Sequence, residues 1–305
     1  MYFPYLRGRQ YEMLALRELA QGGFLGSRVV PVLEPIKLSP TFNGTVNLFT
    51  DMGQPLALIL NPAVGYLSGN SAAQAVLPFI SGSVVPSLII DKNTIKIIDE
   101  IYKKFISNKD ILAIMTNRDY IDNYRSIFDA MPPKFTMLPD ERLIRSTIIE
   151  NKVMFEDKFK KQEKNTDYLK EEDEFFSDDH LYFKDEGFVG FGDYSILGDE
   201  YADSGFAPYA VAIHIVYFAE DNTLRVRHFV SDSNMDTSDV AGKYQEALQK
   251  LKKWYDTGQS RQLTSALSTL LNHTHGYYPG LLTVKKLSIM HHFELMGRYL
   301  DGGLA

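Results

Sequence analysis

Acidic side chains directly follow several short apolar runs of this sequence, and carboxylates in such positions can act as general acids or bases or bind metals. Glu34 follows the run Val29–Leu33, and Asp193 follows Phe188–Gly192. We predict catalytic roles for these two residues and for Glu156. Three further acids at run ends are the predicted oxygen ligands of a hard divalent cation such as Mg²⁺ or Mn²⁺: Asp91, Asp140 and Asp157.

Basic, amide and aromatic side chains occupy neighbouring positions and could bind an anionic group, for which arginine offers two parallel donors. The predicted substrate-binding residues are Arg7, Lys37, Asn61, Asn117, Arg118, Lys158 and Tyr194. Together the two sets fit a phosphodiesterase-like hydrolase acting on a phosphate-bearing or other anionic small molecule or nucleotide, in which a metal polarises a phosphate oxygen and activates water. The alternative is that these polar residues only mark where strands reach water, and that some of them form plain ion pairs.

The elements that would position these residues are short, β-branched apolar runs, most of them separated by stretches that could be helical. The runs are Phe3–Leu6, Val29–Leu33, Leu56–Leu60, Val84–Ile90, Ile111–Thr116, Phe135–Leu138, Val153–Phe155 and Phe188–Gly192. Runs without polar alternation are typical of strands covered on both faces. The pattern therefore predicts an α/β protein with a (β/α)8 TIM-type barrel, whose functional residues lie at the C-terminal ends of the strands.

The helices between these runs are predicted from apolar spacing and capping residues. Arg9–Gln21 is expected to be helical and to end at a glycine pair. A later helix is expected to be capped by Asn93. Its predicted buried face consists of Ile95, Ile98, Ile101, Tyr102 and Phe105.

The sequence after the eighth run predicts a β-hairpin insertion at 210–231, followed by an amphipathic helix over Ser238–Asp256 that closes the barrel. We expect residues 1–258 to form the barrel with this hairpin. Residues 259–305 are predicted to be a C-terminal helical appendix packed on the barrel and broken near Gly276–Gly280.

The charged segment Lys158–Glu186 does not follow the alternation of apolar runs with helical stretches. One interpretation is a solvated helix face with a loop. The other is a mobile cover over the barrel mouth, because long excursions after strands often carry such lids.

Composition limits the class of protein. With 305 residues, of which 45% are hydrophobic, the chain can bury a large core. The absence of cysteine excludes disulfides and thiolate metal sites and fits a cytoplasmic location. No signal peptide or membrane-spanning run is visible, so no membrane partner is expected. The net charge of −7 argues against non-specific nucleic-acid binding.

Other motifs carry little catalytic signal. The glycines of Gly187–Gly192 lie within a predicted strand, so they are not a dinucleotide fingerprint, and we expect them to let the eighth strand approach the first. His214 and His228 fall on the hairpin and could face the mouth or solvent. Adjacent His291 and His292 project about 100° apart on a helix, which is a poor geometry for joint chelation.

Three passages carry a resemblance: Tyr2–Glu12, Val30–Pro35 and Gly192–Tyr194. They resemble an uncharacterised bacterial family catalogued under a myxobacterial locus tag (sce seventy-seven twenty-five), and more distantly the Beta proteins of phage satellites. The first family is usually encoded beside a second uncharacterised protein, and the Beta proteins are associated with phage-satellite defence loci. The resemblance implies a partner protein from a neighbouring gene and a role in phage defence, but it supplies no catalytic residues.

The sequence thus leaves two hypotheses for the function. The first is the metal-assisted enzyme described above. The second is a non-catalytic scaffold or regulator that binds a partner protein encoded alongside it. Exposed, convergent carboxylates at the mouth would favour the enzyme, whereas acids already neutralised by Arg or Lys would favour the scaffold.

Overall fold

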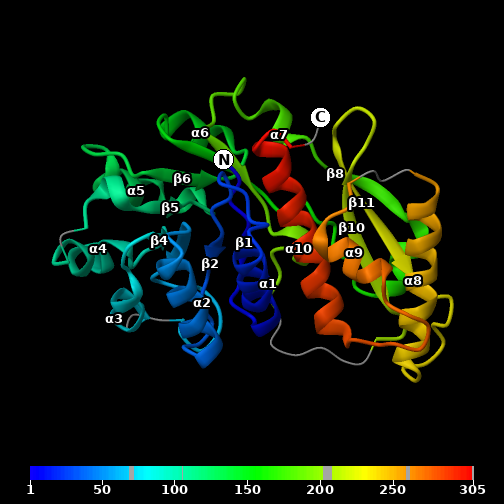
Figure 1. The fold of residues 1–305 in the computed structure, drawn as a ribbon. Helices are drawn as coiled ribbons and strands as arrows, with labels where there is room; N and C mark the ends of the chain where they lie inside the picture. Colours follow the sequence, from blue (N-terminus) through cyan, green and yellow to red (C-terminus); the bar gives the residue numbers. More distant parts are fainter. Residues whose placement is uncertain (69–71, 105, 202–207, 259–261, 304–305) are drawn as a thin grey trace. The chain divides into compact units, whose positions relative to one another are not determined.

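Eight parallel strands form the central sheet of this α/β protein, seen in the computed structural model in Figure 1. The structure describes residues 1–68, 72–104, 106–201, 208–258 and 262–303. Contacts within the chain group it into two compact units. The first unit comprises Met1–Met13, Arg28–Glu156 and Tyr182–Tyr194. The second unit comprises Leu14–Ser27, Asp157–Leu181 and Ser195–Ala305.

The strands of the first unit are paired in sequence order, and every neighbouring pair is parallel. Hydrogen bonds from Phe3 N–H to Phe191 O and from Tyr5 N–H to Asp193 O join the last strand to the first. This closure confirms the predicted (β/α)8 TIM-type barrel. The strands are β1 (Tyr5–Leu6), β2 (Val32–Leu33), β3 (Leu56–Ile59), β4 (Val84–Ile89), β5 (Leu112–Ile114), β6 (Phe135–Leu138), β7 (Lys152–Phe155) and β9 (Gly190–Gly192).

The barrel interior is filled by apolar side chains, as the continuous apolar runs require. A buried cluster contains residues from six of these strands or the residues just before them, among them Phe3, Val32, Ile59, Ile114 and Met137. Each is under 1% exposed. The barrel is therefore a packed core, and any ligand would have to bind outside this layer.

Two glycines allow β9 to close against the chain around β1. A Cβ atom at Gly190 would lie 2.6 Å from Met1 O, and one at Gly192 would lie 2.4 Å from Phe3 O. Both atoms are backbone oxygens, so the clash could only be relieved by moving the strand. The expectation that small residues close the barrel is confirmed.

We expect Gly192→Ala to lower the free energy of unfolding by about 1–3 kcal/mol, because the added methyl group must separate two hydrogen-bonded strands. Urea denaturation followed by circular dichroism measures this loss. Val189→Ala is the control, since Val189 lies three residues before Gly192 but is 41% exposed. Equal stability of Gly192→Ala and the wild-type protein would contradict the claim that β9 and the chain around β1 leave no room for a side chain at Gly192.

Helices connect the barrel strands. Helix α1 (Gln10–Gln21) begins in the first unit and ends in the second. The remaining helices of the first unit are α2 (Pro40–Asp51), α3 (Ala72–Val76), α4 (Thr94–Tyr102), α5 (Ile121–Phe128) and α6 (Arg142–Thr147), with 3-10 turns η1 (Leu77–Phe79), η2 (Asn108–Asp110) and η3 (Arg118–Tyr120).

The predicted buried face of α4 is partly wrong. Thr94 and Ile97 are buried with Ile98 and Ile101, whereas Ile95 is 46% exposed and Tyr102 is 41% exposed. Phe105 lies outside the described residues. The buried face of the helix is therefore shifted by about one residue toward the N-terminus relative to the predicted face.

A three-stranded antiparallel sheet with strand order β10-β11-β8 forms the centre of the second unit. Strands β10 (Ala212–Phe218) and β11 (Leu224–Val230) are the predicted hairpin, which is confirmed. Strand β8 (Asp173–Ser177) pairs with β11. Both interpretations of Lys158–Glu186 are therefore wrong for this part of the segment, which contributes a strand rather than a solvated helix or a cover.

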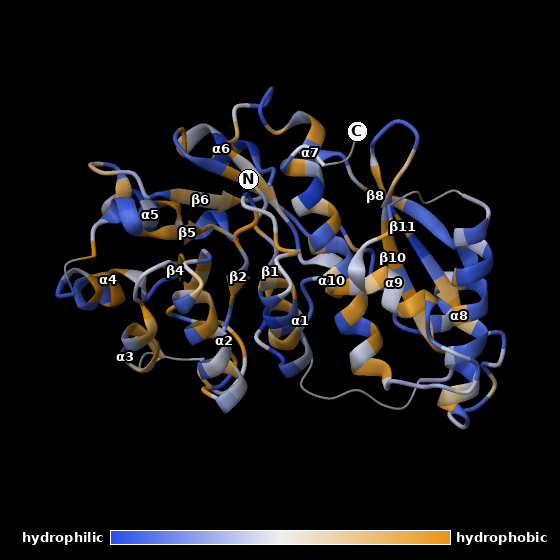
Figure 2. Ribbon diagram, viewed as in Figure 1, coloured by the Kyte–Doolittle hydropathy of each residue, from blue (hydrophilic) through white to orange (hydrophobic). Residues whose placement is uncertain are grey.

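Helices α8 (Val240–Asp256) and α10 (Leu281–Leu300) pack on opposite faces of this sheet. Trp254 of α8 contacts the ring of Tyr217 in β10. His291 of α10 forms a hydrogen bond with the carbonyl of Val216, which comes directly before Tyr217 in the same strand. Contacts thus group α8 with the hairpin rather than with the barrel, and α8 carries hydrophobic and hydrophilic residues side by side (Figure 2). The other elements are α7 (Asp179–Tyr182), α9 (Ser265–Leu271), η4 (Asn165–Lys170) and η5 (Ser195–Leu197).

The break between α9 and α10 falls in the predicted Gly276–Gly280 region. The predicted segments 1–258 and 259–305 are not the units of the contact grouping, because the hairpin and α8 group with the C-terminal helices. Within the described residues, no helix has the length and apolar character needed to span a bilayer.

Candidate functional site

Glu34 lies at the barrel mouth of the first unit, directly after β2. Its side chain is only 1% exposed. Oε2 accepts a hydrogen bond from the Tyr5 hydroxyl at 2.8 Å and lies 3.5 Å from Arg7 Nε. Oε1 accepts the backbone N–H groups of Ala63 at 2.7 Å and Val64 at 3.3 Å. Both carboxylate oxygens are therefore engaged by groups of the protein.

Arg7 lies beside two aromatic rings at this mouth. Its Cζ atom lies 5.9 Å from the centre of the Tyr5 ring and 5.2 Å from that of Tyr194, within the range of cation–π attraction. Tyr5 and Tyr194 also contact Phe155, with ring centres 5.5 Å and 4.8 Å away. Burial and the neighbouring carboxylate of Glu34 raise the pKa of the Tyr5 hydroxyl well above its ordinary value, so Tyr5 remains a hydrogen-bond donor.

Gly8 makes this packing possible. Its φ angle is +58°, and a Cβ atom there would lie 2.9 Å from Glu34 O. A glycine is favoured by both the left-handed backbone and the close approach. The turn after β1 can thus place Arg7 directly against Glu34.

Asp193 also has structural partners. It is 4% exposed, and its Oδ1 accepts the hydroxyl of Tyr2 at 2.9 Å. Its backbone carbonyl accepts the N–H of Tyr5 at 2.8 Å, which is one of the bonds that close the barrel. Glu156 is partly exposed, and its Oε1 accepts the backbone N–H of Asp140 at 3.1 Å.

The three predicted metal ligands are not gathered into one site. Asp91 accepts the N–H of Asn93 at 2.7 Å and the hydroxyl of Thr94 at 3.1 Å, so Asp91 and not the Asn93 side chain fixes the start of α4. Asp140 forms an ion pair with Arg145. Asp157 belongs to the second unit and accepts two backbone N–H groups, those of Phe159 and Asp199. Among the described residues, no three acidic or histidine side chains are grouped so that they could hold a metal ion.

Four of the predicted substrate-binding residues have local structural roles. The Asn61 side chain bonds both the N–H and the carbonyl of Ile89, extending the pairing between β3 and β4. Asn117 caps the η3 turn, and Arg118 pairs with Glu141 at 3.0 Å. Lys158 lies in the second unit, where it pairs with Asp179.

Lys37 and Tyr194 complete the predicted substrate-binding set. The Lys37 side chain is exposed, and Tyr194 packs on Tyr5 and Phe155. The structure thus brings together Arg7, Glu34 and Tyr194 at the mouth, with Tyr5 as a partner that the sequence reasoning missed. The signal for Tyr5 was its position within the first run, two residues before Arg7.

Four histidines of the second unit, His214, His228, His291 and His292, take part in hydrogen bonds with other side chains. His214 Nδ1 lies 2.7 Å from His228 Nδ1, and His228 Nε2 lies 3.0 Å from Glu174 Oε1. The expectation that these histidines face the mouth or solvent is wrong for His228, which is 2% exposed. His291 bonds Thr264, whereas His292 bonds Ser195, so the adjacent pair points to different partners as the helical geometry predicted.

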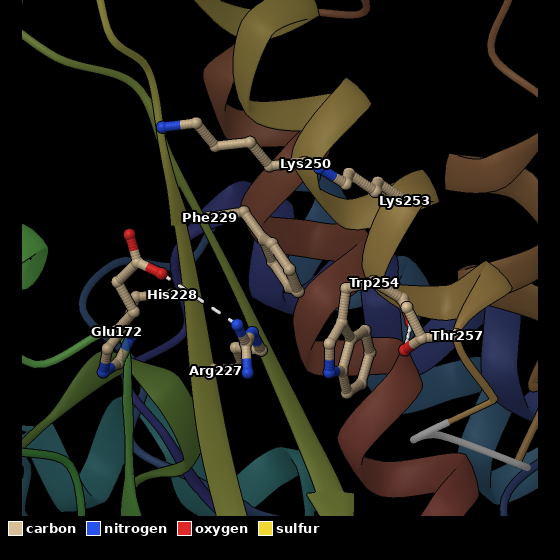
Figure 3. A pocket seen from close by; sticks show the side chains of 8 residues that line it. All are labelled: Glu172, Arg227, His228, Phe229, Lys250, Lys253, Trp254 and Thr257. Atoms are coloured by element: carbon tan, nitrogen blue, oxygen red, sulfur yellow. Dashed lines mark hydrogen bonds and ion pairs between the residues drawn. The ribbon is translucent and has the colours of Figure 1, made fainter.

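A pocket of about 410 Å³ opens in the second unit and contains none of the predicted site residues (Figure 3). It lies between β11 and α8 and includes Trp254, the single tryptophan of the chain. The sequence signals were this tryptophan on an amphipathic helix and the alternating basic residues of β11. The lining residues are Glu172, Arg227, His228, Phe229, Lys250, Lys253, Trp254 and Thr257.

Comparisons of the chain with models of known protein families, with curated proteins and with solved structures found no match.

Proposed function

We propose that this protein is a non-catalytic binding protein in which the barrel is a scaffold. The observation that carries this proposal is the environment of Glu34, the best-placed acid at the C-terminal ends of the strands. Glu34 is almost fully buried, and both of its oxygens accept hydrogen bonds from groups of the protein. Such a carboxylate stabilises the mouth of the barrel rather than acting on a substrate.

An acid or base must come within hydrogen-bonding reach of the proton that it transfers, and a metal ligand must offer a lone pair to the ion. In Glu34 these roles would compete with the hydrogen bonds from Tyr5 and from the amide groups of Ala63 and Val64, and with the ion pair to Arg7. Asp193 would similarly have to release the Tyr2 hydroxyl. Leaving these buried donors without an acceptor costs about 1–3 kcal/mol for each group, which opposes such a rearrangement.

The partner that fits a scaffold of this kind is another protein. The resemblance to a family encoded beside a second uncharacterised protein makes the product of the neighbouring gene the first candidate. A role in phage defence is proposed from the more distant resemblance to the Beta proteins of phage satellites. Co-expression of the two chains, followed by size-exclusion chromatography with light scattering, tests this partnership.

A turnover assay separates the scaffold from the metal-assisted enzyme. Wild-type protein, Glu34→Gln and Asp193→Asn are incubated with Mg²⁺ or Mn²⁺ and a panel of phosphodiesters and nucleotides. We expect no turnover above the rate without protein in any of the three samples. Metal-dependent turnover by the wild-type protein, lost in folded Glu34→Gln or Asp193→Asn, would overturn the proposal.

A further inference from the structure

The pocket between β11 and α8 has the wall composition of a ligand site. Lys250, Lys253 and Trp254 extend from α8, while Arg227 and Phe229 lie on the side of β11 that faces this helix (Figure 3). Its volume of about 410 Å³ is within the range of small-molecule pockets, which is about 300–1,000 Å³. A small organic molecule can therefore fit in it.

The charges that line this pocket favour an anion. Three of its lining residues are cationic, and Glu172 is the one acid among them. Two of the cations already have carboxylate partners: Arg227 pairs with Asp173 at 3.2 Å and with Glu172 at 3.9 Å (Figure 3), and Lys250 pairs with Asp232 at 2.7 Å. Lys253 is exposed and makes no ion pair or hydrogen bond with another residue of the described ranges. Its ammonium group is available to a ligand.

Trp254 supplies a second and independent observation. Its side chain is 5% exposed, and its Nε1–H is buried without a hydrogen-bond acceptor among the described residues. The guanidinium of Arg227 lies 5.9 Å from the centre of the Trp254 ring, and this charged neighbour is another donor and not an acceptor. Most buried donors in folded proteins have an acceptor, and the exceptions often indicate a missing ligand, ion or water.

We propose that this pocket binds a small organic molecule carrying a carboxylate or phosphate group. The anionic group pairs with Lys253, while the body of the ligand packs on Phe229 and the Trp254 ring. Both carboxylate and phosphate oxygens accept such charge-assisted hydrogen bonds. This site is independent of the proposed scaffold role, since it shares no residue with the barrel mouth.

The single tryptophan makes the test direct, because a ¹H–¹⁵N spectrum of the full chain contains one indole resonance. Benzoate and phenyl phosphate are titrated in an amine buffer, with benzyl alcohol as the uncharged probe. We expect either anion, or both, to give a saturable shift of the indole resonance at about millimolar concentration, as its size allows. A shift with one anion alone identifies the preferred group.

Two lysine variants of equal charge change complete the experiment. Lys253→Gln should weaken anion binding about tenfold or more, because it removes a charge-assisted hydrogen bond. Lys109→Gln, at an exposed lysine of the first unit, should leave binding unchanged. The proposal is overturned if neither anion shifts the resonance, if benzyl alcohol binds equally well, or if Lys253→Gln binds as tightly as the wild-type protein.

Discussion

Replacing Glu34 with alanine should lower the free energy of unfolding by about 3–5 kcal/mol, the loss typical of removing one partner of a buried ion pair. The side chain of Glu34 is 1% exposed, and that of its partner Arg7 is 12% exposed. The substitution would leave the Tyr5 hydroxyl, the Arg7 guanidinium and the amide groups of Ala63 and Val64 without their acceptor. Urea denaturation of the purified variant measures the change.

Two further variants serve as comparisons for Glu34→Ala. Glu34→Gln keeps one acceptor oxygen and should lose only about 1–2 kcal/mol. Glu100→Ala removes an acid whose ion pair with Lys103 is exposed, and it should change stability by less than about 1 kcal/mol. Acids kept for catalysis are often held at a cost in stability. Unchanged or increased stability of Glu34→Ala would therefore contradict a structural role for this carboxylate.

Acidification should destabilise the second unit through its buried histidines. Burial lowers the pKa of His291 to about 4 and that of His292 to about 3. An unfolded chain has a histidine pKa of about 6.5, so it binds more protons than the folded chain below that pH, and stability falls as the pH falls. The loss begins near pH 6.5 and continues to about pH 4 for His291 and about pH 3 for His292.

At about pH 5 each of these two histidines should cost about 2 kcal/mol relative to neutral pH. His180, His214 and His228 have lowered pKa values for the same reason and add to the loss in the same direction. Denaturation curves measured between neutral pH and about pH 5 give the slope of the free energy of unfolding against pH. His292→Gln should reduce the slope, whereas His275→Gln, at an exposed position, should not. If His292→Gln leaves this slope unchanged, protonation of His292 does not contribute to the loss of stability at low pH, contrary to our prediction.

The barrel could be predicted because its strands are buried on both faces. Runs such as Leu56–Leu60 and Val84–Ile90 have no polar alternation, and in parallel sheets the covered strands have this composition. The role of the glycines in β9 could also be predicted, because in a barrel of eight strands in sequence order the last strand must pair with the first. These features depend on the local sequence and on rules of strand order.

Strand β8 could not be predicted in the same way. Asp173 bonds Arg225 and Arg227, while Glu174 bonds His228 and Lys160. Most of these partners lie some fifty residues away in the sequence. An acidic segment appears solvated until the basic strand that neutralises it is known.

The same limit applies to the candidate site. The positions of Glu34 and Asp193 at strand ends were predictable, but their availability was not. It depends on Tyr5, whose hydroxyl reaches Glu34 across the β1–β2 pair, and on Tyr2, whose hydroxyl reaches Asp193 only once the barrel is closed. The partner that occupies a polar group is a property of the tertiary structure.

The most direct test of the central claim, that the acids at the barrel mouth serve the structure, is a Mn²⁺ titration followed by the electron paramagnetic resonance signal of the free ion. Wild-type protein, Glu34→Gln and Asp193→Asn are titrated at the same concentration, after circular dichroism has shown that each is folded. We predict the same Mn²⁺ uptake by all three proteins. A saturable site in the wild-type protein that disappears in either variant would contradict the claim.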